Sequence, residues 1–339
     1  MKKKWIVCII LPFLISCGND DVTQKQRFLI RGNNALAEQN YRDAQRFLQE
    51  ALKIDSCYTP AVNNLGVVFY EQSQYSKAVL AYNNTLDCDP MYIDAYINRA
   101  NAFYELREYY RALDDLEYAK SQLPDSVKVH FMLGLVHSKL RRYDQSLNAF
   151  NRALQLDSSN AEIWINRGSV KYYQDKYDQA LEDLEKALEL DPFEGNAYNA
   201  IALIAIENED YQKALEMLEK ALSFEANEPY YLNNRGFVYL QMGELEKAKE
   251  DIDASIVYDA SNPWAYRNKG LYYLKKQQYD EALKLLKQAA RLDPYAEKVH
   301  YYLAQTLIQM GQSAEGCNLL QTAVNDGYAS HEELKGICQ

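Results

Sequence analysis

Asparagine side chains recur in this sequence at fixed spacing, and an asparagine amide can bind the backbone of another polypeptide. Asn64, Asn98, Asn166, Asn234 and Asn268 are separated by 34 or 68 residues. An amide carries both donors and an acceptor, so it matches a peptide bond without requiring a particular sequence. The spacing predicts a row of amides, each of which has the groups to pair with a peptide bond. The alternative is that these asparagines bond locally, between neighbouring helices.

Charged side chains follow the same period. An arginine directly follows three of the asparagines, and an aspartate lies 16 residues after each arginine. The expected pairs are Arg99–Asp115, Arg167–Asp183 and Arg235–Asp251. Where an apolar residue replaces the arginine, the aspartate position is also uncharged, although Arg31 and Lys269 face Phe47 and Leu285 instead of an acid. We therefore expect three partly buried ion pairs with a structural role.

No arrangement of side chains in the sequence suggests catalysis or metal binding. The four histidines are His130, His137, His300 and His331, and none has a further ligand at a convincing spacing. The sequence also contains no glycine-rich phosphate loop and no nucleophile elbow. We therefore expect no enzyme activity, no cofactor and no bound metal.

The elements that position these residues are predicted by a repeat of 34 residues that begins at Lys25. Apolar residues recur at helical spacing in two segments of each unit. A small residue occupies the eighth position of every unit, and another occupies the twentieth, where two helices of a hairpin must approach closely. Proline, as at Pro90 and Pro192, ends several units because it cannot donate a hydrogen bond within a helix.

This 34-residue pattern resembles the tetratricopeptide repeat, and the resemblance covers residues 25 to about 330. It implies an all-α fold, a right-handed α-solenoid (superhelix) of nine helix-turn-helix repeats with a C-terminal capping helix. The repeats are expected at residues 25–58, 59–92, 93–126, 127–160, 161–194, 195–228, 229–262, 263–296 and 297–330, and the cap at residues 331–339.

The resemblance also indicates where a partner would bind. Positions 2, 6, 9 and 13 of each unit share one face of its first helix, and in tetratricopeptide repeat solenoids this face lines a concave groove. The array resembles the asparagine ladder of O-linked N-acetylglucosamine transferases, whose amides hold an extended peptide. Tyr230, Trp264 and Phe237 lie on this face beside Asn234 and Asn268. Exposed aromatic clusters are typical of interface hot spots, so repeats seven and eight are the predicted site; packing of these rings between repeats is the alternative.

Four cysteines beyond the N-terminal segment predict two disulfides. Cys57 directly precedes the first helix of repeat two, and Cys88 lies near the end of its second helix. Antiparallel packing would bring these two residues together. Cys317 and Cys338 would connect the capping helix to the last repeat. Buried free cysteines are the alternative.

The N-terminal residues resemble a bacterial lipoprotein signal. Three lysines precede an apolar run that ends in Leu-Ile-Ser-Cys, with the cysteine at position 17. The resemblance implies a signal peptide at residues 1–16, lipidation of Cys17 and a lipid-anchored tether at residues 17–24. An ordinary signal peptide with a chance cysteine is the alternative. We expect a protein of the bacterial cell envelope, anchored to the outer membrane on its periplasmic or surface face.

The charge of the chain limits its partners. The formal net charge is −11, and removal of the three N-terminal lysines would change it to −14. Such a body disfavours nucleic acid and anionic headgroups as partners, and it permits a basic protein segment. We expect a non-catalytic scaffold that binds a protein or peptide segment and contacts the membrane only through its lipid anchor. A surface lipoprotein that binds glycans or other nutrients is the alternative; the oligomeric state is not predicted.

Overall fold

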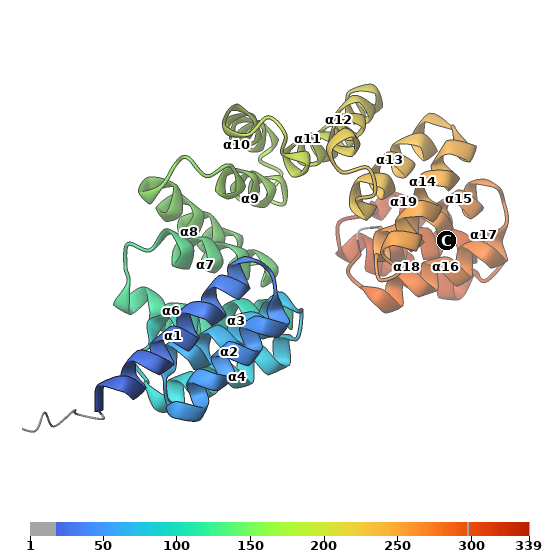
Figure 1. Ribbon diagram of the computed structural model, residues 1–339. Coiled ribbons are helices and arrows are strands. Elements are labelled where there is room, and N and C mark those ends of the chain that lie inside the picture. The colour runs from blue at the N-terminus through green and yellow to red at the C-terminus, as the bar shows by residue number, and fades with distance from the viewer. Residues whose placement is uncertain (1–17, 297, 339) are drawn as a thin grey trace, which may run out of the picture. The chain divides into compact units, whose positions relative to one another are not determined.

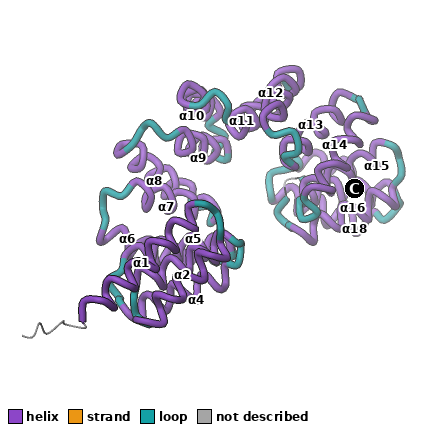
Figure 2. Tube along the Cα trace, viewed as in Figure 1, coloured by secondary structure: helices purple, strands orange, loops and turns teal. Residues whose placement is uncertain are grey.

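The computed structural model describes residues 18–296 and 298–338, and these residues contain nineteen helices and no strand (Figure 1, Figure 2). The predicted all-α fold class is confirmed. No helix among these residues is long and apolar enough to cross a membrane. The predicted signal peptide and the predicted lipidation site, Cys17, lie outside the described residues.

Eighteen helices form nine hairpins, each made of a first helix and a second helix, and α19 (His331–Cys338) follows the last hairpin. The first helices are α1 (Gly18–Ala37), α3 (Thr59–Glu71), α5 (Ile93–Glu105), α7 (Val127–Lys139), α9 (Ala161–Tyr172), α11 (Gly195–Glu207), α13 (Pro229–Met242), α15 (Pro263–Lys275) and α17 (Val299–Gln309). The second helices are α2 (Tyr41–Ile54), α4 (Tyr75–Cys88), α6 (Tyr109–Gln122), α8 (Tyr143–Leu156), α10 (Tyr177–Leu190), α12 (Tyr211–Phe224), α14 (Leu245–Tyr258), α16 (Tyr279–Leu292) and α18 (Ser313–Asn325).

Helix α1 differs from the sequence-based expectation for the N-terminal segment. It begins at Gly18, so most of the segment expected as a tether, residues 17–24, is part of a helix. Neither proline nor a further glycine occurs between residues 19 and 24, so nothing in this stretch interrupts the helix.

Each hairpin closes where a small residue of the first helix meets a large residue of the second. The large residue, at position 24 of each unit, is almost completely buried in all nine hairpins. A Cβ atom added to Gly66 would lie 2.4 Å from the ring of Tyr82, and one added to Gly134 would lie 2.4 Å from the ring of Phe150. The glycines at these two positions therefore make room for an aromatic ring, and the predicted close approach of the two helices at the small residue is confirmed.

The described residues divide into two compact units, one that ends at Asp157 and one that begins at Ser158. The first unit contains the hairpins α1 to α8, and the second contains the hairpins α9 to α18 and the terminal helix α19. Within each unit, the second helix of one hairpin packs against the first helix of the next, as α2 does against α3 and α12 against α13. The hydrophobic clusters formed in this way each draw their residues from a single unit.

Candidate functional site

The predicted site lies on the side of the first helices that carries positions 2, 6, 9 and 13, which we call the asparagine face. In the second unit its amides bond to one another. Asn234 Nδ2 donates to Asn199 Oδ1 at 2.8 Å. Asn233 Nδ2 donates to Asn234 Oδ1 at 3.2 Å, and Asn268 Nδ2 donates to Asn233 Oδ1 at 2.8 Å. These bonds connect α11, α13 and α15.

The first unit contains a similar network. Asn64 Nδ2 donates to Asn33 Oδ1 at 2.7 Å, and Asn63 Nδ2 donates to Asn64 Oδ1 at 3.0 Å. Asn98 Nδ2 then donates to Asn63 Oδ1 at 3.2 Å, so the bonds connect α1, α3 and α5. Three neighbouring first helices are thus joined by side-chain amides in each unit.

The remaining predicted asparagine, Asn166, bonds within its own helix. Its Nδ2 donates to the backbone carbonyl of Glu162, one turn earlier in α9, at 2.8 Å. It therefore connects no neighbouring helix through this bond and takes no part in the amide network of α11, α13 and α15.

One member of the predicted row requires a correction. Asn268 is completely buried, and its Oδ1 accepts hydrogen bonds from Arg267 Nε at 3.1 Å and from a terminal guanidinium nitrogen at 3.0 Å. The prediction that Asn268 contacts a bound segment is wrong, because burial between α13 and α15 removes its amide from the surface. Asn64, Asn98, Asn166 and Asn234 are half-buried.

Sequence reasoning missed the asparagines that complete the two networks. Asn63, Asn199 and Asn233 occupy position 5 of their units and Asn33 occupies position 9, so a search at position 6 does not find them. The available signal was the doubled asparagine, which occurs as Asn63-Asn64 and again as Asn233-Asn234.

The aromatic residues of repeats seven and eight come together on the same face. Tyr230 and Trp264 lie in the first turns of α13 and α15, with their ring centroids 6.2 Å apart in an edge-to-face arrangement. Tyr230 is 43% exposed, whereas Trp264 and Phe237 are half-buried. The Arg267 guanidinium lies 5.7 Å from the centroid of the Phe237 ring. Tyr230 thus presents an exposed aromatic surface that Trp264 supports from one side.

All three expected arginine–aspartate pairs form, and each joins the first helix of a hairpin to the second. Each arginine makes two hydrogen bonds to its partner, at 2.8 and 2.7 Å for Arg99–Asp115, 2.8 and 2.6 Å for Arg167–Asp183, and 2.6 and 2.8 Å for Arg235–Asp251. Burial raises the pKa of the Asp115 carboxyl, and the hydrogen bonds from Arg99 oppose that rise. The geometry is that of a pair holding two helices together.

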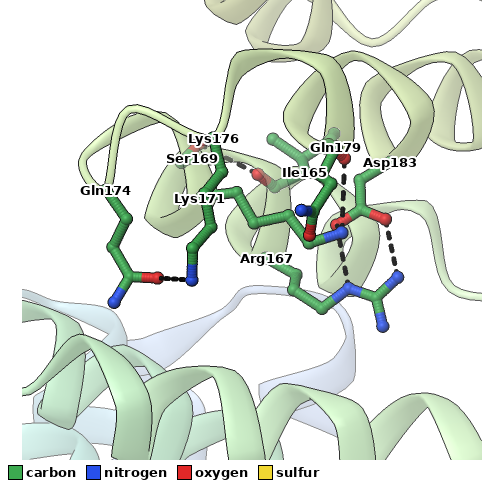
Figure 3. Close-up of polar contacts among 8 residues, drawn as sticks. All are labelled: Ile165, Arg167, Ser169, Lys171, Gln174, Lys176, Gln179 and Asp183. Carbon is green, nitrogen blue, oxygen red and sulfur yellow. Dashed lines mark hydrogen bonds and ion pairs between the residues drawn. The ribbon is translucent and has the colours of Figure 1, made fainter.

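Asp183 also binds a second cation, which the sequence analysis did not identify. Lys171 Nζ lies 2.8 Å from Asp183 Oδ2 and donates to the backbone carbonyl of Gln179 at 3.2 Å. Figure 3 shows Arg167 and Lys171 approaching the same carboxylate. Lys171 follows Arg167 by four residues, which places both side chains on one face of α9, and this spacing was the available signal.

The two basic residues without an aspartate at the expected distance also have partners. Lys269 Nζ lies 2.8 Å from Asp253 Oδ1, and Asp253 accepts a second bond from Lys249 at 2.6 Å. The Arg31 guanidinium lies 5.8 Å from the centroid of the Phe47 ring, within the range of a cation–π contact.

Both expected disulfides form. Cys57 is bonded to Cys88 with a Cα–Cα distance of 5.5 Å, and Cys317 is bonded to Cys338 with a distance of 5.7 Å. The first closes repeat two at the start of α3 and the end of α4. The second fixes the end of α19, which has no buried residue, to α18.

The two histidines of α7, His130 and His137, are buried in the packed interior. His130 Nε2 lies 2.8 Å from the carbonyl oxygen of Pro124 and is nearly buried. His137 is also buried, and within the described residues its Nδ1 atom has no hydrogen-bond partner. No group of three or more His, Cys, Asp or Glu side chains in the described part of the chain could hold a metal ion.

A cavity of about 420 Å³ lies near the C-terminal end. Its lining combines α15, α16, α17, α18 and α19 and consists of Leu274, Tyr279, Gln305, Ile308, Gln309, Leu320 and Ile337. The lining is largely apolar and contains no acidic or basic residue.

Comparison with known proteins identifies the repeat. Family models described as tetratricopeptide repeat or TPR repeat match residues 66–107, 127–160, 159–224, 234–297 and 273–337. None of the curated proteins compared with the chain matches it.

Two solved structures illustrate the similarity in fold. The APC/C hetero-tetramer Cut9–Hcn1 is 16% identical with a TM-score of 0.64, and the match covers 95% of this chain and 63% of that one. The chain thus spans less than two thirds of that relative. A structure described as the functional characterisation of Pseudomonas aeruginosa pilF is 22% identical with a TM-score of 0.50, covering 63% of this chain and 97% of that one. Both likenesses concern the fold alone.

Proposed function

Because the chain belongs to the tetratricopeptide repeat family, we propose that it is a non-catalytic scaffold that binds an extended segment of another protein along its asparagine face. The observation that carries this proposal is the exposed Tyr230 ring held against Trp264 on that face in repeats seven and eight. An aromatic ring already fixed by its neighbours loses little conformational entropy on binding, which favours its use as an anchor.

The amide network assigns different roles to the asparagines of this site. Asn268 is buried and fixes Asn233, so it supports the face from beneath. Asn234 is half-buried, and its bonds to Asn199 and Asn233 use one donor hydrogen and one lone pair of an amide that has two of each. We propose that Asn234 offers its second donor and acceptor to a peptide bond of the bound segment while Tyr230 packs against a side chain.

The partner can be tested by pull-down from detergent-solubilised envelope, comparing the wild type with the double variant Tyr230→Ala, Trp264→Ala. A suitable control is Tyr110→Ala, Tyr258→Ala, which removes two exposed aromatic rings from second helices. We expect the specific partner to be lost with the first double variant and retained with the control. Equal retention by both variants, each with an unchanged circular dichroism spectrum, would contradict the proposed site.

We further propose that the protein is anchored in a bacterial cell envelope, at the outer membrane, through lipid on Cys17. The proposal rests on the sequence that ends in Leu-Ile-Ser-Cys at position 17. The Cys17→Ala variant should move from the membrane fraction to the soluble fraction, since acyl chains supply the membrane affinity. A variant that stays fully in the membrane fraction after cleavage of its signal peptide would contradict the anchor.

A further inference from the structure

The turns between hairpins of the second unit expose aromatic rings that the proposed function does not use. Phe193, in the turn between α10 and α11, is 71% exposed, and Phe224, at the end of α12, is 37% exposed. Their ring centroids lie 5.6 Å apart in an edge-to-face arrangement. We call Phe193, Phe224, Glu194, Glu225 and Glu228 the acidic–aromatic edge.

The two rings rest on a buried support. Phe224 also contacts Tyr198, with ring centroids 5.9 Å apart. Tyr198 is buried and donates a hydrogen bond from its hydroxyl to the Pro192 carbonyl at 3.2 Å, in the turn that carries Phe193. The exposed rings are therefore held in place before any partner arrives, which lowers the entropic cost of binding.

Carboxylates adjoin both rings in the sequence, since Glu194 directly follows Phe193 and Glu225 directly follows Phe224. One cation lies beside their support, because Lys220 Nζ is 4.7 Å from the centroid of the Tyr198 ring. Burial and neighbouring carboxylates raise the pKa of both Glu194 and Glu228, and Glu225 acts on both. The other acids that act on them are Asp191, Glu162 and Asp259. These charged neighbours are all acidic, while the Tyr230 backbone N–H, which donates to Glu228 Oε1 at 3.4 Å, opposes the rise in the pKa of Glu228. A cation placed here would relieve this repulsion.

The negative charge and the exposed rings of the edge determine which class of partner can bind there. Among the described residues, no group of three or more His, Cys, Asp or Glu side chains could hold a metal ion. Nucleic acid and anionic lipid would be repelled by the carboxylates. A second copy meeting the same edge about a two-fold axis would bring the carboxylates of both copies together. A positively charged segment with apolar side chains fits both properties of the surface.

We propose that the acidic–aromatic edge is a second docking surface, which binds a basic protein segment that combines lysine or arginine with apolar side chains. The apolar side chains pack on Phe193 and Phe224, and the cations lie among Glu194, Glu225 and Glu228. This inference goes beyond the proposed function because it assigns a surface made by the turns rather than by the asparagine face.

The test measures binding of the full chain to a fluorescein-labelled peptide of alternating lysine and leucine by fluorescence anisotropy. Two variants change the edge: the triple Glu194→Gln, Glu225→Gln, Glu228→Gln, and the single Phe193→Ser. The triple Glu182→Gln, Glu185→Gln, Glu216→Gln is the matched control, since it removes the same charge from exposed positions of α10 and α12. Melting temperatures and circular dichroism confirm that each variant is folded.

At ~0.1 M salt we expect the edge triple to weaken binding about tenfold, Phe193→Ser about fivefold and the control triple less than about twofold. The double variant Tyr230→Ala, Trp264→Ala should bind the peptide as the wild type does. This last result separates the edge from the asparagine face, so either proposal can fail while the other holds.

Several results would overturn the proposal. Equal losses in the edge and control triples would mean that the peptide senses only net charge. An unchanged affinity for Phe193→Ser would exclude contact with the rings. Phe193-dependent binding to phosphatidylcholine vesicles, with unchanged peptide binding, would assign the edge to a membrane. Self-association that Phe193→Ser abolishes in sedimentation, again with unchanged peptide binding, would assign it to a second copy.

Discussion

At the scale of single residues, the arginine–aspartate pairs stabilise their hairpins only while both partners are present. Asp251 is nearly buried and Arg235 is about three-quarters buried, so neither charge is fully solvated when its partner is removed. The lone charge then costs far more than the intact pair contributes. Repeat six has Ile201 and Met217 at the equivalent positions, which shows that the fold accommodates an apolar pair there.

The first prediction follows from this comparison. Asp251→Ala should lower the free energy of unfolding by about 3–5 kcal/mol, because it leaves Arg235 without its carboxylate. The double variant Arg235→Ile, Asp251→Met, which copies repeat six, should lose much less. Urea unfolding followed by circular dichroism measures both, and a double variant as unstable as the single would contradict the role given to the pair.

A second residue-scale prediction concerns pH. Burial lowers the pKa of His137 below its ordinary value of 6.5; Glu117 opposes this effect, and Arg142 and Lys120 add to it. The folded state therefore favours the neutral ring. As pH falls below about 6.5 the unfolded chain binds the proton more readily, so stability present above that pH is progressively lost.

Replacing His137 by phenylalanine should reduce this loss, since Phe69 and Phe103 occupy the same position in repeats two and three. The measurement is the free energy of unfolding at several values between about pH 7.5 and pH 5. The variant should show a smaller decrease than the wild type. Identical pH dependence would mean that His137 is not the titrating group.

The residues of the candidate site could be predicted only in part. The ion pairs could be predicted because both partners repeat with the 34-residue period. An aspartate is present in the same repeats that carry the arginine, so the two positions indicate a contact. The asparagine period was also visible, but a period does not show which side chains bond to one another. Asn268 shares its position with Asn234, yet α13 and α15 bury one and leave the other half-exposed.

At the scale of the elements, every hairpin turn contains one residue in the left-handed region of backbone conformation. The residue at position 15 of each unit has a φ angle between 56° and 80°, although only Gly243 and Gly311 are glycines. The turn closes by a backbone bond from the next residue to the last turn of the first helix, as from Gln74 to the Phe69 carbonyl at 2.8 Å. The hydrogen bonds thus hold residues other than glycine in an unfavourable conformation.

Substitution at this position gives the third prediction. Glu209→Gly should raise the free energy of unfolding by roughly 0.5–1 kcal/mol, because glycine removes the Cβ penalty of the left-handed region at some cost in chain entropy. Glu209→Ala should give no such gain, since alanine keeps the Cβ atom. Thermal and urea unfolding of both variants test this, and equal stability of the two would contradict the explanation.

The fourth prediction concerns the terminal helix α19. It has no buried residue, and the disulfide between Cys317 and Cys338 fixes its end to α18. Breaking this disulfide should lower the free energy of unfolding by about 3 kcal/mol, because the unfolded chain regains the entropy that the closed loop removes. Cys338→Ser should therefore speed hydrogen exchange in residues 331–338 while exchange in α3 and α4 stays unchanged. Full protection of α19 in the variant would show that the disulfide is dispensable.

Sequence periodicity was sufficient to predict the paired helices but not their turns. Apolar spacing and small residues determine where helices form and approach, so units two to eight begin their first helices at the expected residue. The left-handed residues could not be predicted from composition, because Ser73, Arg107 and Glu209 are not typical of that conformation. Their conformation comes from closure of the hairpin.

At the scale of the whole molecule, the chain divides into two units within an unbroken repeat pattern. The 34-residue period passes through residues 157 and 158 without an insertion, so no linker signals the division. The period determines each hairpin, whereas packing of one hairpin on the next depends on the particular side chains at their contact. In a repeat array each hairpin contacts only the hairpins next to it. The free energy of unfolding of each unit therefore depends on its own hairpins and on the interfaces between them.

The central claim is that the asparagine face of repeats seven and eight binds one extended segment of a partner protein. Site-specific photo-crosslinking in intact cells tests it most directly, with a benzophenone amino acid at Tyr230 or Trp264 and, as a control, at Val257, which is highly exposed on a second helix. We expect crosslinks from Tyr230 and Trp264 to reach one short contiguous stretch of a single protein, and Val257 to give none there. Crosslinks scattered over several proteins, or equal crosslinking from Val257, would contradict it.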